Sequence, residues 1–130
     1  VLEVATFYTI FNLKPVGKYF LQACTTTPCW LRGSDNMMRC IKDRYGISSG
    51  ETSECGRFTL LEVECLGACV NAPILQVNDD FYEDLDYAST GALLDSLEAD
   101  TPLAVGSVTG RSGSEADGGA TTLQDLKPAE

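Results

Sequence analysis

Residues 58–73 read FTLLEVECLGACVNAP, an apolar strand that runs directly into two closely spaced cysteines. Leu61 and Val63 alternate with Glu62 and the glutamate after it, which is the two-residue period of a β-strand over residues 58–65. The small and apolar residues that follow predict a loop or a single turn. This part of the chain therefore predicts a strand whose carboxyl end carries a pair of cysteines.

A second strand with the same ending lies upstream. Residues 18–24, KYFLQAC, form an apolar run that leads into TTTPC, which ends at Cys29. Between the two strands, residues 30–45 have helical periodicity, and Gly46 follows as a stop. The residues expected along the apolar face of this helix are Trp30, Leu31, Met37, Met38, Ile41 and Tyr45. A strand, a crossover helix and a second strand imply one parallel pair.

The rest of the domain predicts a hairpin and a closing helix. Residues 74–77 and 81–83 are the expected third and fourth strands, and residues 88–97 form a helix that Asp86 or Ser89 could cap. The expected fold is α/β, a mixed four-stranded sheet with helices, of thioredoxin type.

The chain divides into three segments by composition. Residues 1–17 are expected to be the end of an N-terminal helical segment and a linker, and residues 18–100 the folded domain. Residues 101–130 form a Gly-rich acidic tail without aromatic residues, which we expect to be irregular and packed on a partner. All of the excess negative charge lies in residues 79–130, either as a solvated surface or as a docking face for a basic partner.

Composition excludes several classes of protein. The 130 residues include no histidine, which excludes Ser-His-Asp and Cys-His catalysis and all His-ligated metal sites. A net charge of -10 argues against nucleic-acid binding. No apolar stretch is long enough to span a bilayer, so no direct membrane insertion is expected. We also find no nucleophile paired with a base.

The cysteines carry the remaining signal. Four residues separate Cys24 from Cys29, and three separate Cys65 from Cys69. Because each pair follows one of two parallel strands, we expect four thiolates at one edge of the sheet. Disulfides need an oxidising compartment for which the sequence gives no sign, and thiol exchange would need C-x-x-C. Spacing alone leaves two interpretations open, a structural zinc ion and a [2Fe–2S] cluster.

Two further cysteines fall outside this pattern. Cys40 lies within the expected first helix, where a lone cysteine usually acts as a small buried hydrophobe. Cys55 lies in a polar loop and is expected to be an unligated thiol.

Several segments together resemble one family. VATFYTIFNLKPVGKYFLQAC, CTTTPCWLRGS and FTLLEVECLGACVNAPILQVNDDFYEDL are similar to the thioredoxin-like [2Fe–2S] subunit of respiratory complex I, NADH:ubiquinone oxidoreductase. The TTTPC form and the tail look more like the mitochondrial version than the bacterial one. The chain departs from the family at its start, near the end of the N-terminal helical bundle.

The resemblance implies a function, a cofactor and partners. Cys24, Cys29, Cys65 and Cys69 would be the ligands of a [2Fe–2S] cluster, which exchanges single electrons with an FMN. The partners would be the flavoprotein subunit that binds FMN and NADH and the large iron–sulfur subunit, in the peripheral arm on the matrix side of the mitochondrial inner membrane. The chain would thus act in a proton-translocating oxidoreductase without catalytic residues beyond the cluster.

Two alternatives remain beside this hypothesis. One is the equivalent diaphorase subunit of an NAD-linked hydrogenase or formate dehydrogenase, in which related subunits occur. The other is a structural zinc-bound assembly module with no role in electron transfer.

Overall fold

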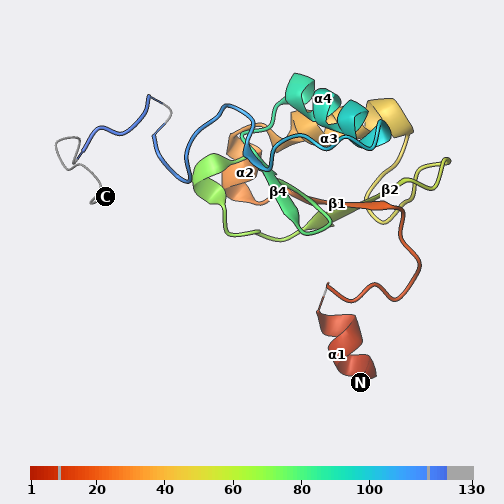
Figure 1. Ribbon diagram of the computed structural model, residues 1–130. Coiled ribbons are helices and arrows are strands. Elements are labelled where there is room, and N and C mark those ends of the chain that lie inside the picture. The colour runs from red at the N-terminus through yellow and green to blue at the C-terminus, as the bar shows by residue number, and fades with distance from the viewer. Residues whose placement is uncertain (9, 117, 123–130) are drawn as a thin grey trace, which may run out of the picture.

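The computed structural model describes residues 1–8, 10–116 and 118–122 and contains one mixed sheet (Figure 1). Its strands, in the spatial order β2-β1-β3-β4-β5, are β1 (Tyr19–Cys24), β2 (Phe58–Val63), β3 (Leu75–Val77), β4 (Asp80–Glu83) and β5 (Gly106–Ser107). β1 is parallel to β2 and antiparallel to β3, and the hairpin partner β4 is parallel to β5. The predicted α/β class and parallel pair are confirmed.

The expected count of four strands is wrong, because β5 comes from the segment that was assigned to the irregular tail. Gly106 and Ser107 pair with Tyr82 and Glu83 at the edge of the sheet. A strand of two residues has no apolar alternation, so the period that reveals the other strands is absent here.

The α-helices are α1 (Leu2–Phe7), α2 (Thr27–Leu31), α3 (Ser34–Tyr45) and α4 (Tyr87–Glu98). Helices α3 and α4 lie side by side over one face (Figure 1). Their apolar side chains and those of the strands below form the main core. Its largest members, all fully buried, include Leu21, Met37, Ile41, Phe58, Leu60, Leu75, Tyr82, Leu93, Leu94 and Leu97.

The single helix expected over residues 30–45 is two helices. Gly33 has a φ of 93°, a left-handed conformation that breaks the helical path between α2 and α3. Because of this break, Trp30 and Leu31 do not share the apolar face of α3 and are 57% and 71% exposed. Met37 and Ile41 are buried as predicted, and Gly46 ends α3 in the left-handed conformation.

Strand β2 alternates as predicted, but its deepest side chains lie on the other face. Phe58 and Leu60 are buried against the helices, whereas Leu61 and Val63 are only half-buried on the opposite face. The two-residue alternation of the strand places Leu60 on the same face as Glu62. Alternation separates the two faces of a strand, but it does not say which of them the helices cover.

The first residue before α4 supplies its cap. Asp86 accepts a hydrogen bond from the Ser89 backbone N–H at 2.7 Å, and the Ser89 hydroxyl accepts one from the Asp86 backbone N–H at 2.8 Å. This reciprocal capping box satisfies backbone donors that a helix leaves unpaired, and it confirms the predicted cap.

The N-terminal helix α1 stands away from the sheet (Figure 1), and none of its residues is buried. The division of residues 1–17 into the end of an N-terminal helical segment and a linker stays a prediction. Within the described ranges, no helix is long and apolar enough to cross a membrane.

Candidate functional site

The parallel pairing of β1 and β2 brings the two cysteine loops to one edge of the sheet. Cys24, the last residue of β1, is in register with Val63, the last residue of β2. Cys29 follows in α2, and Cys65 lies two residues beyond β2. Cys69 begins η1 (Cys69–Asn71), the short turn that the sequence predicted.

The four thiols form two adjacent pairs. The sulfur atoms of Cys65 and Cys69 lie 3.3 Å apart, and Cys24 and Cys29 pack together in one small buried cluster. The two loops also meet, because Leu66 and Ala68 pack against the buried cluster that contains Cys24 and Cys29. The structure thus places the four cysteines that the sequence singled out as two pairs at the same edge of the sheet.

Burial differs sharply between the two pairs. Cys24 and Cys29 are fully buried, and they form a small apolar cluster with Ala72 and Ile74. Cys65, in contrast, is exposed, and Cys69 is half-buried. One side of the site is therefore shielded by protein, and the other opens at the surface.

Hydrogen bonds and burial set the proton affinity of the thiols. Burial alone would raise the pKa of Cys24, but hydrogen bonds from the Thr26 side chain and backbone and from the Leu66 backbone lower it overall. Burial, with the neighbouring Cys24, raises the pKa of Cys29 to about 12. The hydrogen bond with Cys65 raises the pKa of Cys69. Cys24 is thus predisposed to lose its proton, whereas a bound metal would have to displace the protons of Cys29 and Cys69.

The donor set fits a two-iron cluster. Within the described residues, no three or more His, Cys, Asp or Glu side chains are gathered closely enough to hold one metal ion. The thiols instead make two pairs, and a [2Fe–2S] cluster takes two thiolates on each of its irons. Backbone donors also face the sulfurs: the N–H of Gly67 lies 3.4 Å from the Cys65 sulfur. Such donors stabilise the anionic sulfur of a thiolate.

The two other cysteines lie elsewhere. Cys40 is fully buried in the main core on α3, which confirms its predicted role as a small hydrophobe. Cys55 is exposed, and its sulfur lies 3.2 Å from the Ser53 hydroxyl. All six cysteines are free thiols.

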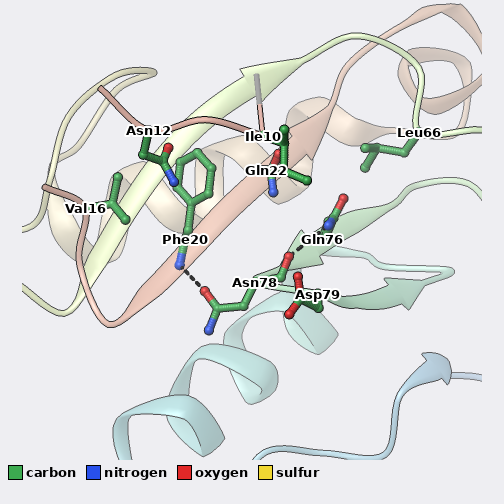
Figure 2. Close-up of a pocket in the computed structure, with 9 residues that line it drawn as sticks. All are labelled: Ile10, Asn12, Val16, Phe20, Gln22, Leu66, Gln76, Asn78 and Asp79. Carbon is green, nitrogen blue, oxygen red and sulfur yellow. Dashed lines mark hydrogen bonds between the residues drawn. The ribbon is translucent and has the colours of Figure 1, made fainter. Parts of the chain in front are cut away.

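A hollow of about 420 Å³ lies on the sheet face that the helices leave open (Figure 2). The linker residues Ile10, Asn12 and Val16 line one side, and Phe20 and the side-chain amides of the sheet line the floor. The Phe20 N–H donates to the side-chain oxygen of Asn78 at 2.9 Å. Leu66 borders the hollow, which therefore adjoins the second cysteine loop.

Three large apolar residues that follow cysteines of the site in the chain are exposed. Trp30 and Leu31 follow Cys29 directly, and Val70 follows Cys69; all three are more than half exposed. Exposed apolar residues close in the chain to the cysteines of a site are candidates for a contact surface.

The sequence analysis missed the polar residues that form hydrogen bonds with the residues after Cys69. Asn71, Asp84 and Arg111 form a buried polar network next to Cys69. Asn71 follows the second pair closely and could have been singled out as a polar residue in an apolar loop. Arg111 carries no such signal, because it lies in a Gly-rich segment far along the chain.

Comparison with known proteins gives consistent results. Residues 1–98 match the family described as thioredoxin-like [2Fe-2S] ferredoxin. An NADH-quinone oxidoreductase subunit of Rickettsia conorii is 60% identical over 98 residues, covering 75% of this chain and 59% of that protein. The mitochondrial NADH dehydrogenase [ubiquinone] flavoprotein 2 of Dictyostelium discoideum is 54% identical over 121 residues, covering 93% of this chain and 49% of the relative. The chain thus spans about half to three-fifths of these relatives.

Solved structures share the fold. An NAD+-reducing [NiFe]-hydrogenase in the air-oxidized state matches with a TM-score of 0.69 at 22% identity, over 78% of this chain and 18% of the hydrogenase chain. A thioredoxin-like [2Fe-2S] ferredoxin from Aquifex aeolicus matches with a TM-score of 0.55 at 15% identity, over 68% of this chain and 87% of its own. The chain belongs to the thioredoxin-like [2Fe–2S] ferredoxin family, whose cofactor is a [2Fe–2S] cluster.

Proposed function

We propose that this chain is a one-electron carrier subunit of a complex I-type NADH dehydrogenase. When bound, a [2Fe–2S] cluster would supply the electron-accepting and electron-donating centre, in exchange with the FMN of an adjacent flavoprotein subunit. The observation that carries the proposal is the pair of cysteine loops at one edge of the sheet, with one thiol pair buried and the other at the surface. The names of the Rickettsia and Dictyostelium relatives support the assignment to this complex.

The ligands in this proposal are Cys24, Cys29, Cys65 and Cys69. The buried pair would hold the inner side of the cluster, and the exposed pair would bring its outer side to the surface where a redox partner docks. Electron transfer needs a short path between centres, and it does not need a general acid or base. A cluster placed at the surface of a small domain meets this requirement.

The proposed partners are the flavoprotein subunit that binds FMN and NADH and the large iron–sulfur subunit of the peripheral arm. The exposed Trp30 supports a docking surface around the site, because aromatic residues are enriched at the centre of protein interfaces, and Leu31 and Val70 would add apolar area to it. The Dictyostelium relative is named as mitochondrial, which supports a mitochondrial location, and the matrix side of the inner membrane is part of this proposal.

Two experiments test the proposal in sequence. Iron, acid-labile sulfide and zinc are measured per chain in protein purified without air; the proposal expects iron and sulfide in equal amounts, and zinc alone would make the chain a structural module. The chain is then mixed with the flavoprotein subunit and NADH, and the paramagnetic signal of the reduced cluster is recorded. A signal that appears only when the flavoprotein is present supports the assigned partner, and its absence in an intact mixture contradicts it.

The second candidate is the diaphorase subunit of an NAD-linked hydrogenase, which the shared fold with the NAD+-reducing hydrogenase favours. Native co-purification distinguishes the two. The complex I assignment expects the fractions that contain this chain to oxidise NADH with a quinone as acceptor. The alternative expects the same fractions to reduce NAD+ with hydrogen.

A further inference from the structure

The first part of the C-terminal segment folds back on the domain. Residues 106–115, which we name the strap, begin with β5 on the edge of β4. The Val108 backbone N–H continues this pairing by donating to the Glu83 carbonyl at 3.1 Å. The strap therefore packs on the chain itself, and packing on a partner stays a prediction for the remainder of residues 101–130.

Arg111 is the centre of the strap. Its Nε and Nη2 atoms donate to the two carboxylate oxygens of Asp84 at 3.0 and 2.5 Å. The two side chains are only 12% and 6% exposed, so the pair is largely withdrawn from water. Asp84 also accepts from the Ser107 hydroxyl at 2.5 Å, which connects the start of the strap to the same carboxylate.

The same guanidinium reaches the second cysteine loop. Arg111 Nη2 donates to the carbonyl of Val70, the residue after Cys69, at 3.2 Å. Its Nη1 donates to the Glu115 carbonyl at 2.9 Å, which closes the strap around the arginine. A planar group with several fixed donors is suited to hold a carboxylate and two carbonyls at once.

Asn71 provides a second connection between the strap and the loop. Its side-chain amide donates to the Gly113 carbonyl and to Glu83 Oε2, both at 2.6 Å, and the residue is 3% exposed. The Asp84 backbone N–H in turn donates to the Asn71 carbonyl at 2.7 Å. Both residues that follow Cys69 are thus fixed by hydrogen bonds to the strap and to Asp84.

The Cys65 end of the loop is held by apolar packing, because Leu66 packs against the buried cluster that contains Cys24 and Cys29. Cys65 is exposed, and Gly67 has a φ of 82° with open space where a side chain would be. The hydrogen bonds to the strap are therefore made at the Cys69 end of the loop, through Val70 and Asn71. Since that end is held by the strap, the position of the Cys69 sulfur depends on residues far away in the sequence.

We propose that Arg111, acting through Asp84 and the Val70 carbonyl, is a positioning residue for Cys69, and that the strap is a working part of the cluster site. This inference rests on the proposed ligand set. It extends the site beyond residues 1–98, which are the part of the chain that matches the family.

The test uses the full chain with its cluster and a set of variants. Cluster release to an iron chelator is timed without air, and the visible circular dichroism and the midpoint potential of the cluster are recorded. Arg111→Ala and Asp84→Asn should each release the cluster about 10-fold faster or more, the size typical of lost support to a metal ligand. Arg111→Lys should fall between them and the wild type, because an ammonium keeps the charge but cannot reach all the acceptors.

Arg44→Ala is the control, since Arg44 makes a more exposed two-oxygen ion pair with Asp95, between α3 and α4 and not at the four proposed ligands. It should release the cluster at the wild-type rate. If Arg111→Ala lowers thermal stability but leaves the release rate, dichroism and potential unchanged, the pair is only structural and the inference is overturned.

Cys69→Ala separates this inference from the proposed function. If Cys69→Ala loses the cluster while Arg111→Ala behaves as wild type, the ligand set stands and the positioning role falls. If Cys69→Ala keeps a normal cluster, the ligand set and the inference that rests on it both fall.

Discussion

Cys29 and Cys40 form a matched pair that tests the ligand assignment within one chain. Both side chains are fully buried, and burial raises the pKa of both thiols. Replacing either with alanine removes one sulfur atom from a packed interior. Because a buried cysteine behaves as a small hydrophobe, each change should cost the cluster-free protein about 1 kcal/mol in free energy of unfolding. For a domain of this size that lowers the melting temperature by about 4 °C.

The cluster should respond in opposite ways. Cys29→Ala removes a proposed ligand from the buried pair and should abolish the visible spectrum, whereas Cys40→Ala should retain iron, sulfide and spectrum at the wild-type level. The assay is iron and sulfide per chain with the absorption spectrum, measured beside thermal unfolding of the cluster-free forms. Equal loss of the cluster in both variants would refute the assignment, because it would show that core packing alone controls retention.

Three further predictions concern the fold. Leu94→Ala, at a fully buried position, should cost about 3 kcal/mol in chemical unfolding, whereas Leu103→Ala, 42% exposed, should change stability by less than about 0.5 kcal/mol; similar losses would contradict the described core. Asp86→Ala removes the cap of α4 and should cost about 1 kcal/mol by the same measurement, and an unchanged midpoint would argue against the capping box. The hydrogen bond from Lys18 lowers the pKa of Asp100 to about 2, so this carboxylate stabilises the fold above about pH 4 and the benefit disappears as the pH falls toward 2. The stability deficit of Asp100→Asn should therefore shrink over that interval, and a deficit independent of pH would refute the ion-pair explanation.

The sequence predicts those parts of the fold in which apolar residues recur with a regular period. Alternation located the strands that became β1 and β2, and a strand–helix–strand order required them to be parallel. From that one topological fact the convergence of Cys24 and Cys65 could be predicted, because parallel strands end at the same edge. The placement of the cysteines at one edge of the sheet was therefore predictable, and their role as ligands stays a prediction.

The features that could not be predicted depend on tertiary contacts. Gly33 divides the first helix, and helical periodicity continued through it without interruption, so Trp30 was placed on the wrong surface. The strand β5 and the Arg111–Asp84 pair involve a segment of low apolar content whose order comes from long-range hydrogen bonds. Local propensity contains no signal for such contacts.

The measurement that tests the central claim most directly is the iron, sulfide and zinc content of the chain purified without air, with its spectrum before and after dithionite. The account predicts two irons and two sulfides per chain and a visible spectrum that bleaches on reduction, as expected for a [2Fe–2S] cluster on four cysteines. One zinc per chain without iron, reproduced in protein isolated from its native assembly, would contradict the account and leave a structural module in place of an electron carrier.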